Sequence, residues 1–214
     1  MAGNDTKGST PARDPFRTFA SKAVPIDIAN CDTDQIIPGR YLRRADDDPE
    51  YPTFLLHDLR FNADGTEKDF VFNRAEYKGA EIIVADENWG CGSSRENAVT
   101  ALRASGIRSV IAPSFADIHY SNCIKNGVLP VRLPSEICDN LRRQLHEGPG
   151  AEIAIDLDAQ SITGPDQQSY SFEIDAFDKY RLLSGLDDIG MTLEYDEEIA
   201  SFAETYKAAH SWAE

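Results

Sequence analysis

Apolar and polar residues alternate most regularly in the middle of the chain, between Gly79 and Gly150. Short apolar runs there are separated by longer segments that carry apolar residues at helical spacing. The pattern predicts strands over 81–85, 109–112 and 128–133, and helices over 93–104, 115–125 and 135–147. Strands that alternate with helices are typical of a parallel sheet with right-handed crossovers, so we expect an α/β fold.

The segments that flank this core are less regular. The pattern predicts further strands over 19–28, 152–157, 161–163 and 169–174, and helices over 176–184 and 197–209. Residues 45–52 are acidic and contain two prolines, which predicts an exposed loop, and 53–79 form an irregular but packed excursion. We expect residues 1–15 to be a disordered tail and 16–214 to form a single domain.

Composition narrows the class of protein. The formal net charge of −16 disfavours nucleic acid as a partner, because its phosphates would be repelled. No apolar run approaches the roughly 20 residues that span a bilayer, and the polar N-terminus lacks a signal-peptide core. The four cysteines form no C-x-x-C pair, so this chain is not expected to hold a metal or cluster itself. We therefore expect a cytoplasmic protein with no membrane partner.

The most informative segment is Asn88-Trp89-Gly90-Cys91-Gly92-Ser93-Ser94-Arg95-Glu96-Asn97, which lies between a predicted strand and a predicted helix. Glycines allow a backbone to approach a ligand closely, and unpaired N–H groups at a helix start attract anions. An arginine can bind a carboxylate through two parallel hydrogen bonds. The segment suits an anion site, although a capping box between Ser93 and Glu96 would explain it equally well.

Three other features allow two interpretations each. The loop Asp32-Thr33-Asp34 is a turn held by its own side chains, or a ligand-binding loop at a strand end. Arg40, Arg43 and Arg44 form a solvated surface cluster or bind a carboxylate. His119, inside a predicted helix, fits a structural role better than a ligand role.

Four motifs occur in order along the chain: Asp32-Thr33-Asp34-Gln35-Ile36-Ile37-Pro38, Gly90-Cys91-Gly92-Ser93-Ser94-Arg95-Glu96, Ile111-Ala112-Pro113-Ser114-Phe115-Ala116-Asp117-Ile118 and Asn126-Gly127-Val128-Leu129-Pro130-Val131. Together they resemble the small subunits of 3-isopropylmalate dehydratase, aconitase-like hydro-lyases of leucine biosynthesis. The resemblance covers about residues 16–207.

The resemblance implies an aconitase-type swivelling β/β/α domain, a parallel sheet core flanked by helices with additional β structure. It also implies a separate large subunit that carries a [4Fe–4S] cluster, in a heterodimer or a higher assembly. Together the subunits would convert 2-isopropylmalate, a hydroxy-dicarboxylate, to 3-isopropylmalate by dehydration and rehydration. This chain alone would be inactive.

The resemblance also implies roles for individual residues. Ser93 takes the position of the general base. Ser94 and Arg95 match contacts to the substrate carboxylate, and Asp34 matches an acidic residue of the site. Arg43 falls in a loop that tunes the substrate's variable group. Gly90, Cys91 and Gly92 form the active-site loop.

Two departures leave alternatives open. Asn97 stands where the family usually has histidine, and residues 45–52 lack the glycine-containing turn of many relatives. A related hydro-lyase acting on citraconate, maleate or dimethylmalate is therefore a second hypothesis. A non-catalytic anion-binding module is a third.

Overall fold

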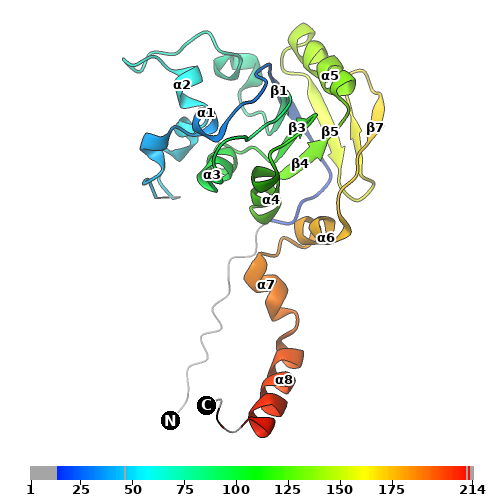
Figure 1. The fold of residues 1–214 in the computed structure, drawn as a ribbon. Helices are drawn as coiled ribbons and strands as arrows, with labels where there is room; N and C mark the ends of the chain where they lie inside the picture. Colours follow the sequence, from blue (N-terminus) through cyan, green and yellow to red (C-terminus); the bar gives the residue numbers. More distant parts are fainter. Residues whose placement is uncertain (1–13, 46, 211, 213–214) are drawn as a thin grey trace.

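The computed structural model describes residues 14–45, 47–210 and 212. Most of the expected N-terminal tail, residues 1–13, lies outside this range. Within it, strands form a seven-stranded sheet in the order β4-β3-β2-β1-β5-β6-β7. The strands are β1 (Phe19–Ile26), β2 (Ile82–Ala85), β3 (Ser109–Ala112), β4 (Leu129–Arg132), β5 (Glu152–Asp156), β6 (Ser161–Thr163) and β7 (Ser169–Ser171). The expected α/β class with additional β structure is confirmed (Figure 1).

Strand β1 belongs to both halves of this sheet. Its second half, Ala23 to Ile26, pairs in parallel with β2, and β3 and β4 continue that parallel half. Its first half, Phe19 to Lys22, pairs antiparallel with β5, and β6 and β7 extend the antiparallel half. The predicted parallel core and the added β structure are therefore joined through one strand.

Helices cover the two faces of the sheet. In chain order, the α-helices of the described residues are α1 (Thr33–Ile36), α2 (His57–Arg60), α3 (Asn97–Ala104), α4 (Asp117–Lys125), α5 (Ser135–Glu147), α6 (Ala176–Ser184), α7 (Asp188–Leu193) and α8 (Asp196–Ala209), and the last two lead away from the sheet (Figure 1). All four residues of β2 are buried, as expected for a strand covered on both faces. Ile83 packs with Leu102 of α3 in one core, and Ile82 packs with Leu141 of α5 in the other.

Most predicted elements are confirmed, and the best example is α6. The side chain of Asp175 accepts hydrogen bonds from the N–H groups of Phe177 and Asp178, and Gly185 ends the helix at φ 69°. An acidic N-cap and a left-handed glycine after the last turn are local signals that a sequence displays directly.

Two expectations about local structure are wrong, and one helix was not predicted. Helix α3 begins at Asn97, not at Ser93. The segment 45–52 is not wholly exposed, because Tyr51 is fully buried and begins a short 3-10 helix, Tyr51–Phe54. Helix α7 was not predicted; Asp187 caps it by accepting the N–H of Gly190.

Candidate active site

The turn from Asn88 to Arg95 connects β2 with α3 and requires glycine at Gly90. The φ angles of Gly90 and Gly92 are +75° and +90°, a region that favours glycine. Gly90 also lies directly against α4: a Cβ added there would be 2.2 Å from Cγ of His119. The turn can therefore take this path only without a side chain at residue 90.

Backbone hydrogen bonds join this turn to the loop that follows β1. The N–H of Gly90 donates to the carbonyl of Cys31 at 2.8 Å, and the N–H of Thr33 donates to the carbonyl of Cys91 at 2.9 Å. The N–H of Ser93 donates to the Thr33 hydroxyl at 3.1 Å. The first and second ordered motifs, about 60 residues apart in the sequence, thus meet at the carboxyl ends of two parallel strands.

Asp32 and Asp34 have different partners. Asp32 is the N-cap of α1: its carboxylate accepts the N–H of Gln35 at 2.8 Å, and the Gln35 side chain accepts the N–H of Asp32 at 2.9 Å. This capping box gives Asp32 a structural role. Asp34 is exposed and forms an ion pair with Nη1 of Arg95. The structure therefore places Asp34 and Arg95 together, as two predicted site residues should lie.

The turn also offers free hydrogen-bonding groups. The hydroxyls of Ser93 and Ser94 are exposed, and within the described residues neither forms a hydrogen bond. The backbone N–H groups of Ser94 and Arg95 likewise donate to no acceptor in this part of the chain. Unpaired N–H groups beside a guanidinium can bind an anion.

The predicted capping box between Ser93 and Glu96 does not form. Ser93 lies four residues before α3, and no side chain caps that helix. The Glu96 carboxylate instead accepts a hydrogen bond from Nδ2 of Asn126 at 2.7 Å. Ser93 therefore has no capping role and belongs to the turn, not to the first turn of α3.

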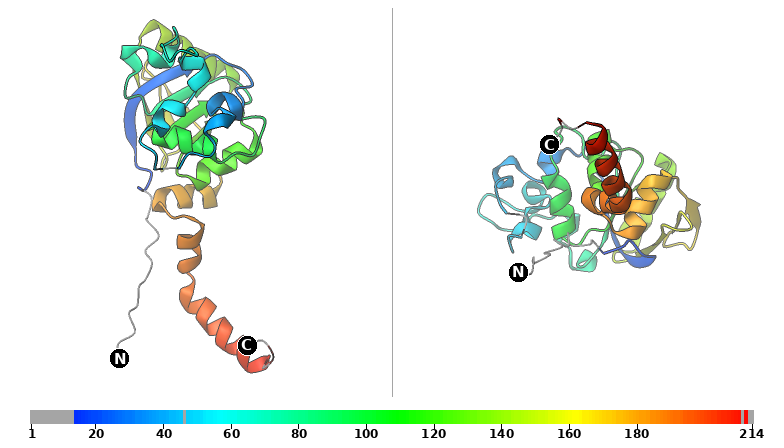
Figure 2. Two further views of the ribbon diagram at one scale, coloured as in Figure 1. Left: turned by 90° about the vertical axis from the view of Figure 1, so that its left-hand side faces the viewer. Right: turned by 90° about the horizontal axis from the view of Figure 1, so that it is seen from below.

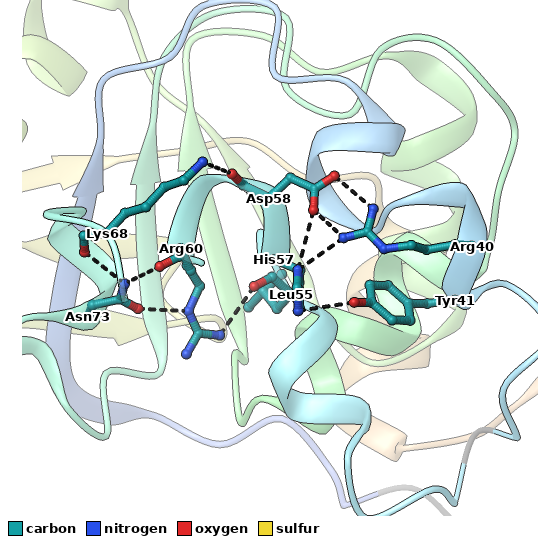
Figure 3. A network of polar contacts seen from close by, with 8 residues as sticks. All are labelled: Arg40, Tyr41, Leu55, His57, Asp58, Arg60, Lys68 and Asn73. Carbon is teal, nitrogen blue, oxygen red and sulfur yellow. Dashed lines mark hydrogen bonds and ion pairs between the residues drawn. The ribbon is translucent and has the colours of Figure 1, made fainter. Parts of the chain in front are cut away.

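Of the predicted cationic cluster, Arg43 is exposed, and within residues 14–45, 47–210 and 212 no hydrogen bond or ion pair joins it to the turn. Arg40 forms two hydrogen bonds to the Asp58 carboxylate, and its Nη2 lies 3.1 Å from Nδ1 of His57 (Figure 3). Hydrogen bonding from Arg40 lowers the pKa of Asp58 to about 2.

The Arg40–Asp58 contact borders the site. A Cβ added to Gly39 would be 3.5 Å from Oδ1 of Asp34, so the segment that carries Arg40 begins beside that carboxylate. Nε2 of His57 lies 3.0 Å from the Tyr41 hydroxyl, which fixes the ring between two side chains of the same segment. Sequence reasoning missed His57 and Asp58, because contacts across 17 or 18 residues leave no local pattern.

The cysteines do not add a metal site. Within the described residues, no group of three or more histidine, cysteine or acidic side chains is arranged to hold a metal ion. Burial raises the pKa of the Cys31 thiol to about 12, and it raises the pKa values of Cys123 and Cys138 as well. Cys91 is partly exposed, and its thiol donates to the carbonyl of Asn30 at 3.3 Å.

A buried arginine fixes the strand ends that carry the site. Arg142 of α5 donates to the carbonyl of Ala85, the last residue of β2, at 2.8 Å. Its guanidinium also pairs with Asp27, which follows β1, at 3.0 Å and with Asp86, which follows β2, at 3.2 Å. The two loops of the site therefore start from strand ends that share one cation.

His119 is the buried neighbour of the turn. It is 2% exposed, and neither ring nitrogen has a hydrogen-bond partner among the described residues. Burial lowers its pKa from 6.5 to about 4, so the ring is neutral at pH 7. This agrees with the structural role expected for it.

The depressed pKa of His119 makes stability depend on pH. Because the folded pKa lies below the unfolded value, the unfolded chain takes up the proton first as the pH falls. The stability that comes from keeping this ring neutral is fully present above about pH 6.5 and declines towards pH 4. The free energy of unfolding should fall by about 1 kcal/mol between pH 7.5 and 5.5. Urea unfolding of the wild type and of His119→Phe measures the difference. Identical pH slopes for both proteins would contradict the assignment.

Comparison with known proteins shows the family of the chain. The family model described as the aconitase C-terminal domain matches residues 14–136, and a second model, LeuD_N, matches residues 139–176. The chain is 47% identical over 198 residues to the 3-isopropylmalate dehydratase small subunit of Paramagnetospirillum magneticum, covering 92% of this chain and 98% of the relative. It is also 47% identical over 201 residues to that of Sinorhizobium fredii, covering 94% and 100%.

A solved structure shows the same fold. The 3-isopropylmalate dehydratase from Methanocaldococcus jannaschii superposes with a TM-score of 0.62 at 30% sequence identity, covering 87% of this chain and 99% of that one. Both ordered motifs that meet at the candidate site fall inside the region of the aconitase C-terminal model. The chain therefore belongs to the aconitase C-terminal domain family and, within it, to the 3-isopropylmalate dehydratase small subunits.

Proposed function

We propose that this chain supplies the proton-transferring and carboxylate-binding half of a hydro-lyase that converts 2-isopropylmalate to 3-isopropylmalate. The observation that carries the proposal is the turn at Ser93, Ser94 and Arg95, where two hydroxyls and two N–H groups that have no partner among the described residues adjoin a guanidinium. Such a set binds a carboxylate and leaves a hydroxyl beside the bound carbon.

In this proposal Ser93 moves the proton. Its Oγ takes a proton from the carbon next to a substrate carboxylate while hydroxide leaves the neighbouring carbon. Hydroxide then adds to the carbon that lost the proton, and Ser93 returns the proton to the carbon that lost the hydroxyl. A serine alkoxide needs electrostatic stabilisation near neutral pH, and the guanidinium of Arg95 with the N–H groups of the turn supplies it.

Arg95 and Ser94 hold the substrate carboxylate in this scheme. Nη1 of Arg95 is engaged by Asp34, whereas its Nη2 and Nε make no hydrogen bond within the described residues. Asp34 thus orients the guanidinium, and two of its nitrogens, Nη2 and Nε, remain to bind an anion. The exposed Arg43 is proposed to contact the variable group of the substrate.

The large subunit completes the site. A family of small subunits implies such a partner, and we propose that it holds the [4Fe–4S] cluster, since the described residues of this chain offer no metal site. When bound, the cluster supplies a Lewis acid for the substrate hydroxyl and carboxylate. This chain contributes the base and the carboxylate contacts.

The proposal is tested by anaerobic reconstitution with the cognate large subunit. 2-Isopropylmalate, citraconate and maleate are offered separately. Ultraviolet absorbance follows the gain of the carbon–carbon double bond as 2-isopropylmalate is dehydrated and its loss as citraconate or maleate is hydrated. We expect turnover of isopropylmalate to be fastest. Absence of turnover with every substrate, while the cluster is intact, would favour a non-catalytic anion-binding module.

A second candidate keeps the reaction and changes the substrate to citraconate, maleate or dimethylmalate. The exposed, cationic Arg43 favours it, because the smaller variable groups of these substrates leave a guanidinium in water, whereas an isopropyl group packed against it would displace part of its hydration. Asn97 adds no support: its Nδ2 lies 3.3 Å from the Tyr51 hydroxyl, which ties it to the packing of α3. A higher rate on citraconate than on isopropylmalate would select this candidate.

Replacing Arg95 by lysine tests the carboxylate contact. Lysine keeps the charge but lacks the planar pair of donors, so we expect KM to rise about tenfold. The matched control is Arg103→Lys, an exposed arginine near the end of α3, whose KM should stay unchanged. Steady-state kinetics of the reconstituted enzyme measure both, and equal KM values would refute the contact.

A further inference from the structure

The C-terminal arm, α7 and α8, leads away from the sheet (Figures 1 and 2). Its base is fixed to the body: Asp188 pairs with Arg181 of α6 at 2.5 Å, and the Tyr180 hydroxyl donates to Glu194 at 2.7 Å. Beyond this base, no residue of α7 (Asp188–Leu193) or α8 (Asp196–Ala209) is buried. The arm is therefore held to α6 at its start, and the residues of its two helices remain exposed or partly exposed.

Helix α8 and its N-cap carry an apolar stripe. Tyr195, Ile199, Phe202 and Tyr206 follow one another at spacings of four, three and four residues, which places them on one face of a helix. Their exposed fractions are 60%, 46%, 67% and 38%. The Phe202 and Tyr206 rings stack at 5.8 Å between centroids, so these two residues of the stripe present one aromatic surface.

An uncovered stripe of this kind indicates a binding surface. A helix of about 14 residues is marginally stable in water without tertiary packing, and contiguous exposed apolar patches mark interaction sites. The spacing of the stripe is that of an amphipathic helix that lies in an apolar groove of a partner.

The charge of the arm identifies the kind of partner. Helix α8 carries four carboxylates, Asp196, Glu197, Glu198 and Glu204, against the single cation Lys207, which gives a formal −3. Two copies that met through their stripes would bring two acidic helices together, and each chain already carries −16. A groove with a basic rim complements the helix, whereas a second copy does not.

From these observations we propose that the stripe of α8 docks into an apolar groove with a lysine- and arginine-rich rim on the large subunit. The choice of the large subunit rests on the proposed function, because a small subunit acts in a lasting complex. Interfaces of that class are large and more apolar than transient ones. The arm would act as an anchor that is separate from the catalytic turn.

The test measures association, not turnover. Full-length wild type and Ile199→Ser/Phe202→Ser are titrated onto immobilised, cluster-loaded large subunit. Loss of two central apolar contacts should raise Kd about 30-fold or more. The control Ala200→Ser/Ala208→Ser lies on the opposite face of the same helix and lowers helix propensity more, so it should bind like the wild type. Higher salt should weaken wild-type binding by screening the rim.

Other outcomes overturn the proposal. An unchanged Kd for the stripe variant would do so, as would equal weakening by the control. Sedimentation of the small subunit alone covers the second-copy alternative: a dimer that the stripe variant abolishes would assign the stripe to self-association. At saturating large subunit the stripe variant should recover wild-type kcat. If the wild-type small and large subunits bind each other but do not turn over substrate, the proposed function is refuted, and the binding measurements still test the docking of α8.

Discussion

Replacing Ser93 by alanine is expected to reduce turnover by about a thousandfold or more while leaving association with the large subunit unchanged. The Ser93 hydroxyl is exposed and unpaired among the described residues, so its removal breaks no contact of the fold. The effect should therefore fall on kcat, because the carboxylate contacts of Ser94 and Arg95 remain. Single-turnover absorbance measurements report the rate of the chemical step, and steady-state measurements report kcat and KM. Together they separate a loss of proton transfer from a loss of substrate binding.

A second serine provides the control. Ser105, at the end of α3, has a hydroxyl that donates to the carbonyl of Pro52 at 3.1 Å. We expect Ser105→Ala to lose a little stability and to keep its turnover. Near-normal turnover by Ser93→Ala would rule out its role as the base. A parallel loss of subunit binding would instead point to a structural role.

Replacing Gly90 by alanine is expected to lower the free energy of unfolding by about 3 kcal/mol. A methyl group there would lie 2.2 Å from Cγ and 2.3 Å from Cδ2 of His119, and the φ of +75° disfavours any side chain. The turn would have to move, and with it the hydrogen bond from Gly90 to Cys31. Activity should fall together with stability.

Gly65 separates the two causes. Its φ is +82°, but a Cβ added there would meet no atom within 4 Å. Gly65→Ala should therefore show only the backbone cost, about 1 kcal/mol. Combining Gly90→Ala with His119→Ala removes the ring that the methyl group meets, so the double variant should regain part of the loss. Urea denaturation of the wild type, Gly90→Ala, His119→Ala and the double variant measures this cycle, and Gly65→Ala is measured beside them. An effect of Gly90→Ala no larger than that of Gly65→Ala would contradict the steric argument.

Local signals explain which predictions succeeded. The buried strands β2 and β3 are short apolar runs, and α6 is bounded by Asp175 and Gly185, so both kinds of element could be found without tertiary information. The start of α3 could not, because the spacing of Ser93 and Glu96 suits a capping box. Tertiary contacts override it: Thr33 holds the N–H of Ser93, and Asn126 holds the carboxylate of Glu96.

The candidate site likewise contains features that the sequence displays locally and contacts that depend on the tertiary structure. Its turn was visible in the sequence because glycines, serines and an arginine cluster within one segment. The ion pair between Arg95 and Asp34 joins residues 61 positions apart, and only the ordered motifs of the family suggested that they belong together. Nothing local pairs Arg40 with Asp58 or buries Tyr51, because both depend on how the excursion between β1 and β2 folds back.

The shared strand β1 has a consequence for how the chain is made. Ala23 pairs with Ile82, which is 59 residues later in the chain, and Phe19 pairs with Ile155, which is 136 residues later. At typical synthesis rates, roughly 7 to 27 seconds separate the emergence of Phe19 from that of its partner on the ribosome. During this interval an apolar strand has an open edge, which is a template for aggregation. Nascent chains of this protein should therefore depend on early chaperone binding near their N-terminus until β5 has emerged.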